Sequence, residues 1–142
     1  MHEVISLLIN RYDFFLQLLW EHIEISLSAS IIAIIIGGLL GVLIHEYKRL
    51  SGPVMLIVNF LYTIPSISML GLLLYISGVG NTTAIIALVI YALLPMVRNT
   101  FTGLDQIKSD MREAGIALGL TRLQRLWNIE IPLAMPTIMA GI

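Results

Sequence analysis

Residues 109–132 read SDMREAGIALGLTRLQRLWNIEIP, a charged and amphipathic segment that lies between strongly hydrophobic runs. Its pattern predicts two short helices joined by a hinge. Ser109 can cap the first helix, and Asp110 and Glu113 place negative charge in its early turns, where the helix dipole favours it. Gly119 stands where this helix would end, and glycine is the residue that most easily takes the positive φ of a helix end.

The second short helix is predicted to begin at Thr121, because Gln124 follows at the spacing of a capping box. Pro132 is expected to end that helix, since proline lacks the N–H that would continue the hydrogen-bond ladder. Pro136 suits the first turn of a new helix. The segment is therefore expected to form a helix, a hinge and a helix between two apolar runs.

The same residues carry a family resemblance. The segment resembles the EAA loop of permease subunits of bacterial ABC importers, whose pattern is Glu-Ala-Ala, three residues, Gly, nine residues, and Ile-x-Leu-Pro. The residues at matching positions are Glu113, Ala114, Gly119, Ile129 and Pro132. Two positions depart from the pattern, because Gly115 replaces the second Ala and Ile131 replaces Leu. Gly115 is expected to loosen its helix by about 1 kcal/mol relative to alanine. An ordinary pair of amphipathic surface helices is the alternative interpretation.

The composition indicates an integral membrane protein. Hydrophobic residues make up 58% of the chain and charged residues only 12%, where a soluble domain carries about 25% charged residues. The net charge of −1 gives no basic surface for nucleic acid, and the absence of cysteine excludes disulfides and thiolate chemistry. The N-terminus lacks the basic start of a cleaved signal peptide.

Three membrane spans are predicted, over residues 23–44, 54–76 and 82–97. The first is long enough to cross a hydrocarbon layer of about 30 Å, whereas the third is short and is expected to borrow residues from its flanks. Small residues recur at every fourth position of the first span and form a ridge for close helix packing. These residues are Ala29, Ala33, Gly37 and Gly41. The predicted fold is an all-α, polytopic transmembrane helical bundle forming a single domain.

The two ends of the chain are interpreted separately. Polar residues recur at a spacing close to 3.5 in residues 1–22, which predicts a helix lying on the outer membrane surface; a tilted extra span is the alternative. Residues 136–142 are the start of a further span and are too few to cross a bilayer. Because permeases of the resembled family continue through more spans, the sequence is expected to be a fragment, truncated after the coupling loop.

Pro65 lies near the middle of the second predicted span and removes the backbone hydrogen bond to the carbonyl of Leu61. Polar side chains gather around this break, and in lipid such groups need partners in a helix bundle or a water-filled path. The candidate translocation-pathway residues are Asn59, Tyr62, Thr63, Pro65 and Ser66. The alternative is structural, with the serine and threonine hydroxyls satisfying the freed carbonyl.

Two further stretches, YTIPSI at residues 62–67 and YALLP at residues 91–95, are similar to permeases for quaternary-amine osmoprotectants. The resemblance extends over most of the chain from residue 23. It implies a permease of the type I ABC importer fold that moves a compatible solute such as glycine betaine, carnitine or choline across the bacterial cytoplasmic membrane. Another solute such as an amino acid, export of amphipaths such as bile acids, a nucleotide-independent channel and a membrane anchor remain as alternatives.

The resemblance also implies partners. These are a second permease copy, identical or not, a separate ATPase that binds ATP and Mg, and an external substrate-binding protein. In this chain we find no phosphate-binding GxxxxGK[ST] motif, no metal-ligand spacing and no nucleophile with its base, so no catalytic residue, metal or cofactor is expected. The residues expected to couple the loop to the ATPase are Glu113, Ala114, Gly115, Ala117, Leu118, Gly119, Ile129 and Pro132.

The distribution of positive charge predicts the orientation. Lys48 and Arg49 lie in the turn at residues 45–52, several basic residues lie in the loop at residues 98–135, and the turn at residues 77–81 has none. Because basic residues are enriched in cytoplasmic loops, the turn and the long loop are expected on the cytoplasmic side. The N-terminus is then expected outside.

Overall fold

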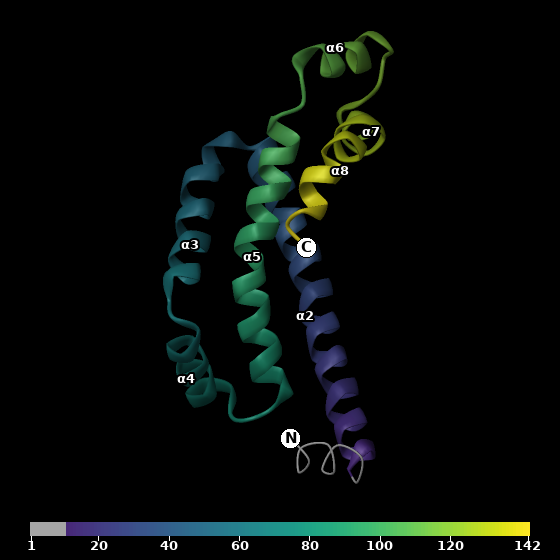
Figure 1. Cartoon of the computed structure of the whole chain (residues 1–142). Helices are drawn as coiled ribbons and strands as arrows, with labels where there is room; N and C mark the ends of the chain where they lie inside the picture. Colours follow the sequence, from purple (N-terminus) through teal and green to yellow (C-terminus); the bar gives the residue numbers. More distant parts are fainter. Residues whose placement is uncertain (1–10) are drawn as a thin grey trace.

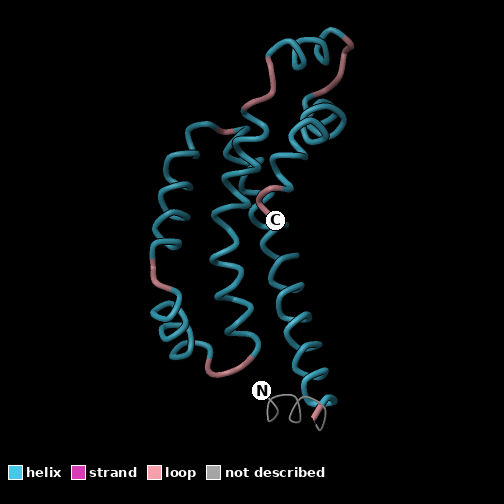
Figure 2. The backbone as a smooth tube through the Cα atoms, in the orientation of Figure 1, coloured by secondary structure: helices cyan, strands magenta, loops and turns pink. Residues whose placement is uncertain are grey.

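A computed structural model describes residues 11–142, and this part of the chain is built from helices without any strand (Figures 1 and 2). The elements are α2 (Tyr12–Glu46), the 3₁₀ turn η1 (Lys48–Leu50), α3 (Ser51–Thr63), α4 (Ser66–Ser77), α5 (Asn81–Asp105), α6 (Ser109–Ala117), α7 (Arg122–Arg125), the π-helical turn η2 (Leu126–Glu130) and α8 (Ile131–Met139). The predicted all-α fold class is confirmed.

Helices α2 and α5 form the most extensive helix pair, and α8, α3 and α4 pack around α5. The ridge of small residues on α2 is fully buried, which confirms the predicted close packing. A Cβ atom added to Gly37 would lie 2.5 Å from Met96 Cβ, and one added to Gly41 would lie 2.5 Å from Thr100 Cβ. The two helices therefore approach more closely than larger side chains would allow.

Helix α2 is a single element of 35 residues, so the boundary predicted between residues 22 and 23 is absent. The separate N-terminal helix predicted over residues 1–22 is wrong for residues 12–22; residues 1–10 lie outside the described part. No proline occurs in α2 and its first glycine is Gly37, so no residue before that point interrupts the backbone ladder. At about 1.5 Å per residue, α2 is roughly 50 Å long.

The second predicted span is two helices rather than one, since α3 and α4 meet at 96° across a break at residues 64–65. Ile64 has φ −68° and ψ 125°, the extended conformation that a following proline imposes. By length and composition, α2 and α5 are able to cross a membrane, and the bent pair adds a third span if it is counted as one.

Helix α5 continues to Asp105, eight residues beyond the predicted end of the third span at Val97. The added turns bury Thr100, Gly103 and Leu104. Leu104 packs in one apolar cluster with Leu126 and Ala134, which come from η2 and α8. Residues 98–105, which their polarity assigned to the loop, are therefore held in the helix by packing against η2 and α8.

Pro132 does not end the second short helix, because α7, η2 and α8 follow one another without a break. Pro132 lies in the first turn of α8 and Pro136 lies inside α8 rather than in its first turn, so both predictions are wrong. The N–H of Ile131 donates to the carbonyl of Leu126, five residues back, as in a π-helix. This wider turn changes the hydrogen-bond register just before the proline that has no N–H to donate.

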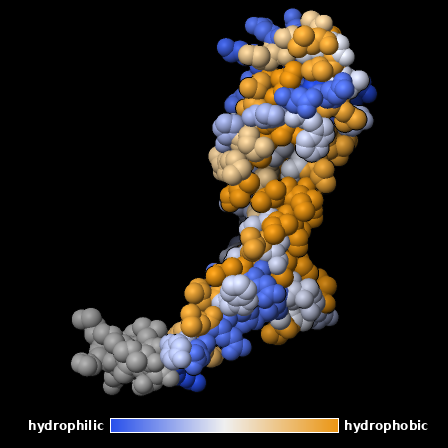
Figure 3. Space-filling model, turned by 90° about the vertical axis from the view of Figure 1, so that its right-hand side faces the viewer, coloured by the Kyte–Doolittle hydropathy of each residue, from blue (hydrophilic) through white to orange (hydrophobic). Residues whose placement is uncertain are grey.

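The two ends of the helix bundle differ. The C-terminal ends of α2 and α5, the start of α3, and α6 and α7 gather at one end, while the turn between α4 and α5 lies at the other (Figure 1). The turn at residues 45–52 and the long loop are therefore at the same end, as predicted. Hydrophobic residues cover the middle of the face shown in Figure 3, with hydrophilic residues toward both ends.

The glycine ridge makes a testable prediction. Gly37→Ala is expected to lower the free energy of unfolding by about 1–3 kcal/mol, because the new methyl group collides with Met96. The matched control is Gly38→Ala, whose Cβ meets no other heavy atom within 4 Å in the described part of the chain. That variant is expected to be neutral or stabilised by up to about 1 kcal/mol. Thermal unfolding in detergent, followed by circular dichroism, measures both; equal melting temperatures would contradict the packing.

Candidate functional site

Helix α6 is formed by the first part of the charged segment at residues 109–132. Its N-cap is Lys108, with φ −59° and ψ 141°, and not Ser109, so the predicted serine cap is wrong. Ser109 is already helical, and its hydroxyl donates to the Asp110 carboxylate at 3.3 Å instead of capping the backbone. Asp110 does lie in the first turn, as predicted, where its charge suits the helix dipole.

The positive φ predicted at the end of α6 is confirmed at Gly119, whose φ is +73°. The N–H of Gly119 donates to the carbonyl of Ile116 at 2.9 Å, and the N–H of Leu120 donates to the carbonyl of Gly115 at 3.1 Å. These two bonds define a Schellman motif, which requires a left-handed residue at the position of Gly119. The chain therefore turns sharply between α6 and α7.

The capping box at the start of α7 is also confirmed. The backbone N–H of Thr121 donates to the Gln124 side chain at 2.9 Å, and the backbone N–H of Gln124 donates to the Thr121 hydroxyl at 3.4 Å. Two backbone donors at the start of the helix are satisfied in this way.

The predicted coupling residues fall into two groups. Those with exposed side chains or backbone are Glu113, Ala114, Ala117, Leu118, Gly119 and Pro132. Gly115 is buried and Ile129 is half-buried, and they face each other, because a Cβ on Gly115 would lie 3.0 Å from Ile129 Cδ1 and 2.9 Å from Arg125 Cδ. Gly115 thus lets α6 pack closely on the helix that follows the hinge, a role that its mild departure from the family pattern did not suggest.

Helix α6 lies at the end of the bundle (Figure 1). Three apolar side chains on it and at its C-cap are exposed. Met111 is 50% exposed, Ile116 56% and Leu118 76%. Met111 and Leu118, seven residues apart, share one side of α6, and Ile116 lies on another. Each gains hydrophobic free energy if a partner protein buries it.

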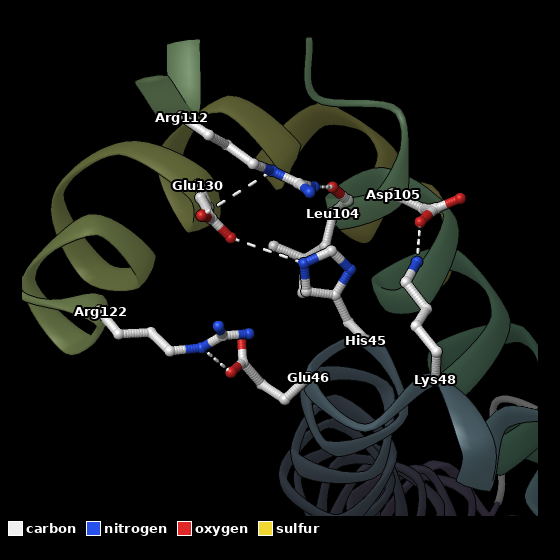
Figure 4. Close-up of polar contacts among 8 residues, drawn as sticks. All are labelled: His45, Glu46, Lys48, Leu104, Asp105, Arg112, Arg122 and Glu130. Atoms are coloured by element: carbon white, nitrogen blue, oxygen red, sulfur yellow. Dashed lines mark hydrogen bonds and ion pairs between the residues drawn. The ribbon is translucent and has the colours of Figure 1, made fainter. Parts of the chain in front are cut away.

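A polar network that the sequence pattern does not predict lies beneath α6 (Figure 4). Glu130, the last residue of η2, is buried, and its two carboxylate oxygens face His45 Nε2 at 3.6 Å and Arg112 Nε at 3.9 Å. Arg112 also donates through Nη2 to the carbonyl of Leu104 at 2.7 Å. The only sequence signal was a single carboxylate within the apolar run at residues 129–135.

Two exposed ion pairs surround this network. Lys48 pairs with Asp105 between η1 and α5, and Arg122 pairs with Glu46 between α7 and α2. The hydrogen bond to Glu46 raises the pKa of the Arg122 guanidinium above its ordinary value. Exposed pairs of this kind typically contribute about 0–1 kcal/mol each.

A metal at this end of the molecule is disfavoured by the charges present. Within residues 11–142, His45, Glu46 and Glu130 bring one potential ligand atom each to within 4.8 Å of one another. The Arg112 guanidinium already faces Glu130, and the Arg122 guanidinium faces Glu46. The carboxylates therefore act as ion-pair acceptors in this arrangement.

The candidate pathway residues lie together at the break between α3 and α4, away from α6. The Thr63 hydroxyl donates to the carbonyl of Phe60 at 2.7 Å, whereas the carbonyl of Leu61 accepts from the N–H of Ile64 at 3.4 Å. Tyr91 of α5 was not predicted here, yet its hydroxyl donates to the carbonyl of Ile64. The Tyr62 and Tyr91 rings pack edge to face, with centroids 6.1 Å apart. Tyr91 thus ties the broken span to α5.

Residues 25–142 match the family described as binding-protein-dependent transport system inner membrane component. The chain belongs to this family. The predicted resemblance to ABC importer permeases is thereby confirmed, and the helices long enough to cross a membrane are those of an inner-membrane component.

Several curated relatives of this permease family are similar over most of the chain. The Bacillus subtilis glycine betaine/carnitine/choline transport system permease protein OpuCD is 42% identical over 89% of this chain and 56% of its own length. The Listeria monocytogenes carnitine transport permease protein OpuCD is 40% identical over 99% of this chain and 65% of its own length. The Salmonella typhimurium osmoprotectant import permease protein OsmW is 40% identical over 99% of this chain. The chain spans between about half and two thirds of the length of the first two relatives.

The tyrosine contact at the broken span of this permease can be tested. Tyr91→Phe keeps the ring against Tyr62 but removes the hydrogen bond to Ile64, so about 1 kcal/mol of local stability should be lost. Amide hydrogen exchange over residues 62–68 is expected to become roughly fivefold faster. Tyr75→Phe serves as the control, because Tyr75 is 91% exposed. Unchanged exchange in Tyr91→Phe would show that the hydrogen bond does not hold the break.

Proposed function

We propose that this chain forms the membrane-spanning part of a permease subunit that imports a quaternary-amine compatible solute, such as glycine betaine, carnitine or choline, driven by a separate ATPase. The substrate class rests on relatives about 40% identical to the chain, which are named as permeases for these solutes. The subunit itself carries no catalytic residue or cofactor; ATP and Mg are bound by the partner.

The main support for coupling to the ATPase through α6 is that apolar side chains are exposed there. Met111 and Ile116 on this short helix, and Leu118 at its C-cap, are exposed at the end of the bundle. These side chains fill a groove on the ATPase, and the exposed Glu113 supplies a polar contact at its edge. The burial of apolar area against the partner provides the binding free energy, at about 25 cal/mol per Å².

The path from α6 to the spans follows from its two attachments. At its C-terminal end, α6 continues through the turn at Gly119 into α7, η2 and α8, and α8 packs against α5. At its N-terminal end, α6 follows directly from α5 through residues 106–108. When ATP closes the pair of ATPase subunits, α6 moves and the spans change from inward-open to outward-open.

The orientation follows from the basic residues at the α6 end, which include Lys48, Arg49 and Lys108. With that end in the cytoplasm, the ATPase reaches α6 from inside the cell. The N-terminus and the turn between α4 and α5 then face outward, where the substrate-binding protein delivers its ligand. A second permease copy completes the pathway.

The break between α3 and α4 is the proposed location of the translocation pathway. Asn59, Thr63 and Ser66 supply polar groups there, and Pro65 keeps the backbone irregular. The face of the Tyr62 ring offers a weak, non-covalent attraction to a quaternary ammonium ion that passes it.

Transport by the full-length permease, assembled with its ATPase and binding protein in proteoliposomes, tests the assignment. Radiolabelled glycine betaine uptake is expected to require ATP and to be reduced by excess choline or carnitine. Flux without ATP would indicate a channel, and uptake reduced only by amino acids would indicate a different solute class.

The hinge supplies a sharper prediction. Gly119→Val forces a β-branched residue into a left-handed conformation that costs about 1–2 kcal/mol or more, so uptake per ATP hydrolysed is expected to fall roughly fivefold or more. Gly119→Asn is the matched control, because asparagine tolerates positive φ, and it should retain coupling. Normal uptake in the valine variant would contradict the proposed hinge.

A further inference from the structure

Glu130 carries a buried carboxylate, and it is not among the residues predicted to couple the loop to the ATPase. The residue is only 6% exposed, and it lies on the same helical face as the buried Leu126 and Ala134. A charge in such surroundings is destabilising unless other charges or hydrogen bonds compensate it. Its neighbours therefore define what it does.

The network around Glu130 connects four elements (Figure 4). Its carboxylate faces His45 at the end of α2 and Arg112 in α6, while Arg112 donates to the carbonyl of Leu104 near the end of α5. One carboxylate and one guanidinium thus join η2, α2, α5 and α6. No other polar contact found in the described residues joins α6 to both of the long helices.

The contact of Glu130 with Arg112 is electrostatic rather than hydrogen-bonded, and the His45 imidazole lies beside the same carboxylate without a hydrogen bond to it. The distances of 3.6 Å to His45 and 3.9 Å to Arg112 are too long for hydrogen bonds, and in residues 11–142 Arg112 Nε and His45 Nδ1 have no hydrogen-bond partner. Coulomb attraction falls slowly with distance, so the attraction between Glu130 and Arg112 survives a small displacement that would break a hydrogen bond. This attraction can hold α6 next to η2 while α6 moves.

We propose that Glu130 is a positioning residue that transmits the displacement of α6 to α2 and α5. Its charge holds Arg112, in the first half of α6, against the ends of the two long helices. Movement of α6 then shifts both helices together, instead of being absorbed by rotation at Gly119. The inference rests on the proposed coupling of α6 to an ATPase.

The test uses the full-length permease assembled with its ATPase and binding protein. In Glu130→Gln, which keeps the side-chain shape and removes the charge, the ATPase is expected to co-purify and to hydrolyse ATP within about twofold of wild type. Uptake per ATP hydrolysed is expected to fall at least about tenfold. Glu130→Asp retains the charge and is expected to recover part of the coupling.

Asp105→Asn is the matched control, because it removes one negative charge from the same end of the molecule but breaks only the exposed pair with Lys48. It should leave both uptake and hydrolysis within about twofold of wild type. Comparing the two variants separates the effect of breaking the buried network from the effect of removing one negative charge at that end of the molecule.

The remaining outcomes decide between the explanations. Unchanged uptake per ATP in Glu130→Gln overturns the proposal, and so does a proportional loss of uptake and hydrolysis. If the glutamine variant does not assemble, Glu130→Asp decides: partial coupling supports the proposal, whereas failed assembly or full loss of coupling overturns it. Absence of ATP-dependent uptake in the wild-type protein would instead refute the proposed function.

Discussion

The close approach of α2 to α5 is the contact on which the other elements depend. It is possible because the buried face of α2 carries no side chain larger than a methyl group from Ala29 to Gly41. Further along, the same contact brings His45 at the end of α2 next to the end of α5, where Leu104 offers its carbonyl to Arg112. Without that approach, His45 and Leu104 would not lie side by side beneath α6.

Two prolines determine where the backbone departs from regular helix. Pro65 forces Ile64 into an extended conformation, and the Thr63 and Tyr91 hydroxyls satisfy carbonyls next to the break. Pro132 instead follows a π-helical turn and the chain continues as helix. The difference lies in the neighbours: α8 packs along α5 directly after Pro132, which holds it in line, whereas α4 turns through 96° from α3.

The features that could be predicted from the sequence are those whose physical cause is local. The four-residue spacing of small residues, the positive φ of Gly119 and the capping box of Thr121 with Gln124 each depend on a few neighbouring residues. The continuation of α5 to Asp105 depends on burial against η2 and α8, which are distant in sequence. Glu130 could not be assigned for the same reason, since its neighbours His45 and Arg112 both come from other elements. Local polarity placed the loop boundary too early and could not show which charge is buried.

The two classes of ion pair at this end of the molecule have different consequences. The exposed pairs of Lys48 with Asp105 and Arg122 with Glu46 are screened by solvent and salt, so their separation changes the free energy little. The buried carboxylate of Glu130 cannot be left without an opposite charge except at a large desolvation cost, so the Arg112 guanidinium must stay near it. Helix α6 is therefore held by Arg112 and by the close packing of Gly115 on Ile129, while Leu118 at its C-terminal end stays exposed.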